Sequence, residues 1–213
     1  MNLPGTSEAV QLFLLVTALS VLPALLFTVT SFTRILIVLG FVRVGLGVPN
    51  APPNQVLVGI ALFLTLFVMA PTFSRVKEAA IDPLREQRIS QETAIRRGEG
   101  PLREFMFRQT RPETLGMFVR LARIERPRTR ADVPTWVLIP AFVISELRTA
   151  FQIGFLILLP FLVIDLVVSA TLMSMGMIML PPVFISLPFK VLLFVLVDGW
   201  DLITRSLVES FHI

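Results

Sequence analysis

The sequence predicts an all-α integral membrane protein. Of its 213 residues, 54% are hydrophobic and only 16% are charged, whereas soluble domains are about 45–50% apolar with about a quarter of their residues charged. The apolar residues form blocks, and four charge-free runs cover residues 9–33, 44–74, 149–164 and 166–189. Several of these runs reach the roughly 20 apolar residues that a membrane-crossing helix needs.

The first zone, residues 1–74, is apolar. We expect a helix at residues 9–30, bent at Pro23, and a second apolar stretch at 34–48. The sequence VPNAPPN that follows is a strong helix stop, because proline lacks an N–H group and restricts the residue before it. Residues 55–73 are predicted to form a third helix that is apolar on nearly all sides, as suits lipid or a buried position.

The second zone, residues 75–134, is polar, and we expect a small helical extramembrane segment. Fourteen basic and nine acidic residues fall here. Because the zone lacks zinc-finger spacing and has few aromatic residues for base stacking, no nucleic-acid partner is expected. Its expected elements are an amphipathic helix broken at Pro83 (76–95), a loop (96–101), two short helices (102–110 and 113–124) and a linker (127–134).

The third zone, residues 135–213, is predicted to be a kinked helical hairpin. A helix at 136–169, containing Pro140 and Pro160, is followed by a break at 173–182 and a last helix at 188–211. In the break, four methionines alternate around a glycine before a double proline. Irregular backbone at membrane depth must be buried in protein or line a cavity, and methionine fills irregular gaps. Two interpretations of these methionines remain. They form a ring contributed by several subunits, or they are ordinary apolar residues of a membrane helix.

Ionisable side chains interrupt the apolar segments, where each needs a partner, a cavity or an interface. Glu146 and Arg148 lie two residues apart, so they point in different directions on one helix. Lys190 is a possible partner of Glu146, across the hairpin or between subunits. We favour buried pairing for Glu146 and Asp165.

No catalytic, metal or cofactor site is predicted. The chain has no cysteine and a single histidine, His212, near its end, which leaves no set of zinc ligands. Asp165 and Asp198 are conceivable as an intramembrane acid pair, but no flanking motif supports them. A small-solute or ion transporter is the alternative class, and it would show inverted repeats or paired broken helices, of which the sequence has neither. A scaffold for a rotary motor is a third class, which would not need a flexible methionine segment.

Long blocks of the sequence resemble the flagellar FliP family. They are TSFTRILIVLGFVR (residues 30–43), PPNQVLVGIALFLTLFVMAP (52–71), PLREFMFRQT (101–110), the block from VPTWVLIPAF to MSMGMIMLPP (133–182) and ISLPFKVLLFVLVDGW (185–200). The blocks are gapless and follow the same order over most of residues 30–205. The corresponding subunit of virulence type III injectisomes is a close relative, and the LPP after the methionines favours the flagellar branch.

The resemblance implies a protomer of an oligomeric helical funnel, the flagellar type III protein export gate. Several copies would assemble with FliQ and FliR, together with FlhB and FlhA, in the bacterial inner membrane at the flagellar basal body. Unfolded flagellar proteins would pass through the centre. The subunit would need no cofactor and have no enzymatic activity, because the proton motive force and a separate ATPase supply the energy.

The resemblance also implies roles for individual residues. The methionine segment would form a gasket around the pore, with Met177 and Met179 at its centre, Met175 beside them and Ile178 where many members carry a third methionine. An inter-subunit ion pair would join Glu146 and Lys190, and Phe105 and Phe118 would support oligomerisation. Asp165 and Arg148 are expected to be buried charges. The family places the middle zone on the periplasmic side, although its positive charge would favour the cytoplasm.

Overall fold

The computed structural model describes residues 10, 12–13, 16–17, 20, 27–48, 50–177 and 179–211, and every regular element in these ranges is helical. Most of the helix expected at residues 9–30 lies outside them, as does His212. The described elements are α2 (Phe32–Leu46), α3 (Asn54–Val76), η1 (Lys77–Ile81), α4 (Asp82–Arg85), α5 (Gln91–Gln109), α6 (Pro112–Leu121), η2 (Arg130–Asp132), α7 (Thr135–Ser174), α8 (Pro182–Leu196) and α9 (Gly199–Glu209).

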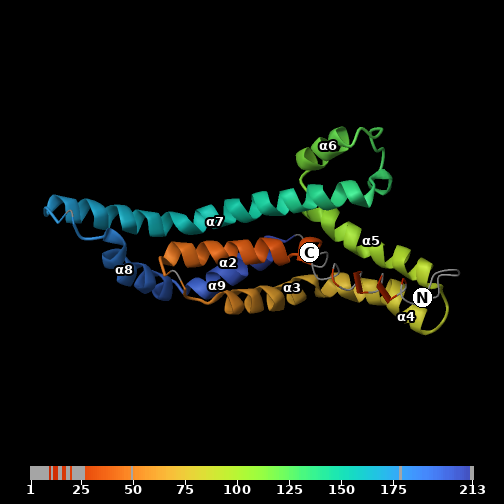
Figure 1. Cartoon of the computed structure of the whole chain (residues 1–213), viewed down its shortest axis with the longest axis horizontal. Coiled ribbons are helices and arrows are strands. Elements are labelled where there is room, and N and C mark those ends of the chain that lie inside the picture. Colours follow the sequence, from red (N-terminus) through yellow and green to blue (C-terminus); the bar gives the residue numbers. More distant parts are fainter. Residues whose placement is uncertain are drawn as a thin grey trace.

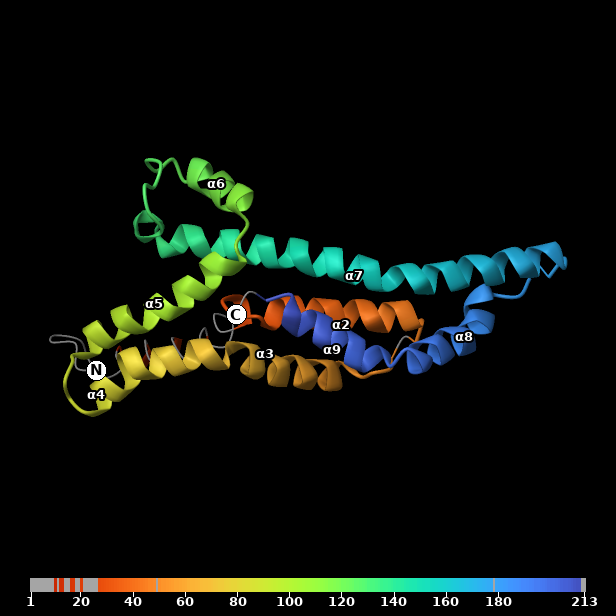
Figure 2. The same cartoon turned by 180° about the vertical axis from the view of Figure 1, so that it is seen from behind.

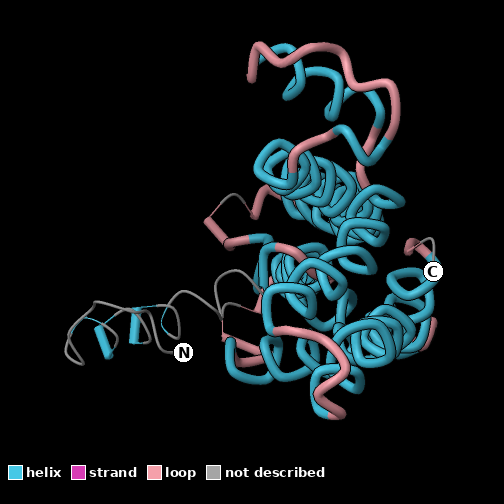
Figure 3. Tube along the Cα trace, turned by 90° about the vertical axis from the view of Figure 1, so that its right-hand side faces the viewer, coloured by secondary structure: helices cyan, strands magenta, loops and turns pink. Residues whose placement is uncertain are grey.

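The molecule is elongated, because the 40-residue helix α7 runs along its length. Helices α2, α3, α8 and α9 lie along one side of α7, and α5 and α6 lie near its N-terminal end (Figure 1, Figure 2). Seen along the long axis, the helices are nearly end-on (Figure 3). The predicted all-helical class is confirmed.

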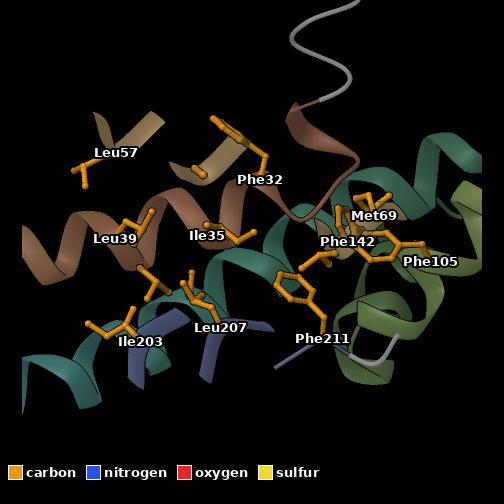
Figure 4. Close-up of a cluster of buried hydrophobic side chains, with 14 of the residues drawn as sticks. Phe32, Ile35, Leu39, Leu57, Met69, Phe105, Phe142, Ile203, Leu207 and Phe211 are labelled. Carbon is orange, nitrogen blue, oxygen red and sulfur yellow. The ribbon is translucent and has the colours of Figure 1, made fainter. Parts of the chain in front are cut away.

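The core forms where α2 packs between α7 and α3. Ile35, Val38, Leu39 and Val42 recur at helical spacing on α2, and each side chain is at most 1% exposed. Side chains from α3, α5, α7 and α9 complete the cluster (Figure 4). Burying one such side chain stabilises the fold by about 1.5–3 kcal/mol, so this face fixes α2 against α7.

Two glycines allow α2 and α7 to approach closely. A Cβ atom at Gly154 of α7 would lie 2.2 Å from the ring of Phe41, and one at Gly45 of α2 would lie 2.5 Å from the ring of Phe161. Each helix therefore inserts a phenyl ring over a glycine of the other. A larger residue at either glycine would displace a ring or separate the helices.

The helix predicted at residues 76–95 with a break at Pro83 is wrong. Helix α3 continues through a π-helical turn, η1, into α4, giving one helical stretch over Asn54–Arg85. The N–H of Asp82 donates to the carbonyl of Lys77, five residues back. Pro83 follows in the first turn of α4, where its missing N–H is tolerated. The chain turns instead at Gln87, which has φ 56°.

The loop predicted at residues 96–101 is also wrong, because these residues lie inside α5. A Cβ atom at Gly98 would lie 3.3 Å from the Cβ of Ala80, so the glycine lets α5 cross η1 closely. Packing there outweighs the poor helix propensity of glycine. The two short helices predicted on either side of residue 111 are confirmed as the end of α5 and as α6.

Helices α7 and α8 of the third zone pack against each other as a hairpin, but the last helix is broken. The break after α7 occupies residues 175–181, and α8 begins at Pro182, a residue type that suits the first turn of a helix. The single helix expected at 188–211 is instead α8 and α9, bent by 64°. Asp198 at the bend has φ 50°, and the ring of Phe194 packs against Gly199.

Among the described residues, two helical stretches are long and apolar enough to cross a membrane, namely Asn54–Arg85 and Thr135–Ser174. Helices α8 and α9 add a third span if the bent pair crosses as one unit. This assignment follows from length and composition. The chain is therefore an integral membrane protein built from helices.

Candidate functional site

The methionine segment forms the tip of the α7–α8 hairpin, at the far end of the molecule (Figure 1). Helix α7 ends in a Schellman motif: the N–H of Met177 donates to the carbonyl of Leu172 at 2.9 Å, and that of Gly176 donates to the carbonyl of Met173 at 3.0 Å. Gly176 has φ 72°, which a residue without a Cβ atom adopts freely. The methionines are thus held on a sharp reversal.

The side chains at this tip face outward. Met179 is 97% exposed and Met175 is 67% exposed, and Met177 is also exposed. Ile178 lies outside the described residues. Phe184, at the start of α8, is exposed beside them. The protomer alone therefore leaves an apolar, deformable tip uncovered.

A buried ion pair joins α2 to α7. The Nε of Arg34 donates to Oε2 of Glu146 at 2.9 Å, and Nη2 of Arg34 binds Oε1. The side chains are 2% and 0% exposed. This forked arrangement matches two donors to two carboxylate oxygens. It keeps both charges compensated in the protein interior.

Arg34 also connects α5 and the end of the described chain. It donates to Oε1 of Gln109 at 3.2 Å and to the carbonyl of Ser210 at 2.7 Å. Its guanidinium carbon lies 3.9 Å from the centre of the Phe211 ring. One side chain therefore joins four parts of the fold. The pairing of Arg34 with Glu146 could not be predicted from the sequence, because the two residues are 112 positions apart.

A second ion pair ties the two arms of the hairpin together. Nζ of Lys190 donates to Asp165 at 2.7 Å, and the hydroxyl of Ser186 donates to the same carboxylate at 2.6 Å. The Lys190 side chain is buried, whereas Asp165 is one-third exposed, so Asp165 has the partner that we expected but is only partly buried. Nζ of Lys190 also lies beside Gly47 at the C-terminal end of α2, where a helix favours positive charge.

The predicted pair of Glu146 and Lys190 is not formed within the protomer. Glu146 is bound to Arg34 and Lys190 to Asp165. A pair between subunits stays a prediction, and it would require both side chains to exchange these partners.

Arg148 is exposed in the protomer, so the expectation of a buried charge is wrong for the single chain. It lies two residues beyond Glu146, and two residues turn a helix by about 200°. When Glu146 faces the core, Arg148 must face away from it.

The two phenylalanines predicted at oligomer contacts differ in exposure. Phe105 is buried within the protomer, with its ring centre 5.9 Å from that of Phe142 and 6.5 Å from that of Phe211. It would therefore support oligomerisation only through the shape of the protomer. Phe118 is half-buried and lines a cleft with Trp136 and Pro140. Its role between subunits stays a prediction.

Comparison with known proteins shows one family. A sequence model of the FliP family matches residues 15–207. The chain is 56% identical to the flagellar biosynthetic protein FliP of Bacillus subtilis, over 97% of this chain and 94% of that protein. It is 57% identical to the protein of that name in Pectobacterium carotovorum, over 96% of this chain and 79% of the relative. The FliP of Caulobacter vibrioides is 54% identical, with coverages of 97% and 78%.

Proposed function

The chain belongs to the FliP family, and on that premise we propose that it is a core subunit of the flagellar type III protein export gate. The family is a membrane component of flagellar export and is not a known enzyme family. We infer that several copies assemble with FliQ and FliR, together with FlhB and FlhA, in the inner membrane at the basal body. Unfolded flagellar proteins would cross through the resulting pore.

The exposed methionine tip is the observation that supports this proposal most directly. Met179 and Phe184 are uncovered in the protomer, and exposed apolar patches mark interaction sites, so we expect other copies to cover the tip. Met175, Met177, Ile178 and Met179 of several copies would form a ring. Methionine side chains have several rotatable bonds and can repack around passing chains of different sequence, which is what a gasket requires.

We also propose a location for the zones of the sequence. Residues 75–134 would be the extramembrane segment, on the periplasmic side. Helix α7 and the bent pair α8–α9 would line the funnel, and the ion pair of Asp165 and Lys190 would hold the two arms of each hairpin together behind the ring.

The mass of the detergent-solubilised complex tests the assembly. The full chain is expressed alone and then with FliQ-type and FliR-type partners. A discrete assembly of several copies, completed by the partners, supports the gate. A stable monomer that ignores both partners contradicts it and favours a transporter.

Leakage through the membrane tests the gasket. Met177→Ala with Met179→Ala should let small molecules cross the membrane of cells that express the complex, because shorter side chains leave the ring open. The matched control is Met117→Ala, an exposed methionine on α6. Leakage from neither variant would indicate a scaffold, and equal leakage from both would show that the tip is not the seal.

A further inference from the structure

A polar cavity of about 300 Å³ lies where the end of α5 and the start of α6 meet α7. Its lining includes three arginines and three hydroxyl groups, from Arg34, Arg108, Arg111, Thr110, Thr149 and Ser210. Among the described residues, no carboxylate lines it. Glu113 and Glu209, which are close by in sequence, are exposed and form no ion pair within the described chain.

The arginines around this cavity outnumber their acidic partners. The charge of Arg34 is compensated by Glu146. Glu104, by contrast, forms the ion pairs of both Arg108 and Arg75. The hydrogen bond from Arg108 lowers the pKa of Glu104, against an opposing effect of desolvation.

Arg111 has no acidic partner within the described residues. Its Nη2 donates to the hydroxyl of Thr149 at 3.3 Å and to Oε1 of Gln152 at 2.5 Å. Both partners are neutral, so they orient the guanidinium without cancelling its charge. The cavity therefore keeps an excess of positive charge, which suits an anion with several acceptor oxygens.

The position of the cavity along α7 indicates where such an anion comes from. A 40-residue helix is about 60 Å long, roughly twice the thickness of the hydrocarbon core of a bilayer. Glu146 and Arg148 are the charged residues of α7 before this point, and Asp165 is the single charge from residue 153 to the end of the helix. The cavity, which Thr149 lines, thus lies just before this long stretch with one charge.

An apolar groove of about 480 Å³ adjoins the cavity, and Ser210 lines both. Leu156 and Ile157 of α7 line this groove, together with Phe194 and Leu202. A charged pocket next to an apolar groove matches a molecule with an anionic head and a hydrocarbon tail.

We propose that this cavity binds the phosphate headgroup of an anionic phospholipid. Arg111 and Arg108 donate to the phosphate oxygens, and the acyl chains lie in the adjoining apolar groove. Basic pockets at the membrane surface recognise anionic lipids in this way. The inference rests on the single chain and does not depend on the export gate.

Lipid binding to the purified full-length chain tests the inference. The chain in an uncharged detergent is titrated with phosphatidylglycerol or phosphatidylcholine, and bound lipid is counted by native mass spectrometry. Wild type should bind phosphatidylglycerol at least about fivefold more tightly than phosphatidylcholine. Arg111→Gln should lose this preference, because it removes the charge and keeps a donor for Thr149 and Gln152.

Arg120→Gln is the matched control, because Arg120 is an exposed arginine on α6 outside the cavity. It should keep the preference of wild type. Equal loss in both variants would show a diffuse basic surface and overturn the site, as would equal binding of the two lipids by wild type. If Arg111→Gln lowers the helical circular dichroism, Arg108→Gln is used in the same comparison.

Inorganic phosphate distinguishes a lipid from a free anion. Phosphate at millimolar concentration should leave most of the phosphatidylglycerol bound, because the acyl chains contribute to the affinity of the lipid. If phosphate alone binds as tightly and displaces the lipid, the site recognises a free anion and the lipid proposal is overturned.

Discussion

Replacing Arg34 with methionine should destabilise the protomer severely. The change leaves Glu146, which is 0% exposed, without its partner. Removing one member of a buried ion pair costs about 3–5 kcal/mol, and the lost cation over the Phe211 ring adds up to about 2 kcal/mol. Since a whole domain is stable by about 5–15 kcal/mol, Arg34→Met should remove a large part of the stability.

The double variant Arg34→Met with Glu146→Met distinguishes the cost of an unpaired buried charge from the cost of altered packing. Apolar side chains of similar volume fill the site and no buried charge is left, so most of the 3–5 kcal/mol should return. Gln109 and Ser210 also lose the hydrogen bonds that Arg34 donates. Each of them that gains no other donor should still cost about 1–3 kcal/mol of stability. The double variant is therefore expected to be more stable than Arg34→Met alone.

Unfolding of the full chain in detergent micelles, followed by helical circular dichroism, measures these differences. Arg148→Met is the control, because this exposed arginine lies on the same helix as Glu146 and should change stability by no more than about 0.5 kcal/mol. The reasoning would be refuted if Arg34→Met cost less than about 1 kcal/mol, or if the double variant were no more stable than the single one.

Three further predictions concern other contacts. Gly154→Ala should cost about 1–3 kcal/mol because the new methyl group meets a phenyl ring, whereas Gly59→Ala, with open space around it, should not destabilise; thermal melts in detergent compare them. Asp165→Asn should destabilise more than Lys190→Met, because Lys190 is the more deeply buried partner; equal losses would contradict this. The lowered pKa of Glu104 means that its ionised form adds stability above about pH 4.5, which is lost as the pH falls through the lower folded-state pKa; Glu104→Gln should therefore lose less stability between about pH 6 and 3 than wild type.

The local pattern of the sequence was enough to predict the helical class and the main reversal. Charge-free runs of about 20 residues favour helices in a membrane, whatever they pack against. Gly176 and the prolines at 181 and 182 mark the end of α7 and the start of α8. Their effect comes from the backbone conformations that glycine and proline favour, so it can be predicted locally. The exposed methionine tip follows directly from that reversal.

The tertiary structure decided which residues meet and which weak helix signals are overridden. Gly98 lies within a helix because α5 crosses η1 closely there, with Ala80 beside the glycine. The bend at Asp198 accompanies the packing of the Phe194 ring on Gly199. The partners of Glu146 and Asp165 are Arg34 and Lys190, which are distant in sequence. A sequence shows that a charge in an apolar segment needs a partner. The identity of that partner depends on which helices lie side by side, because side-chain contacts between helices are set by their packing and not by their order in the chain.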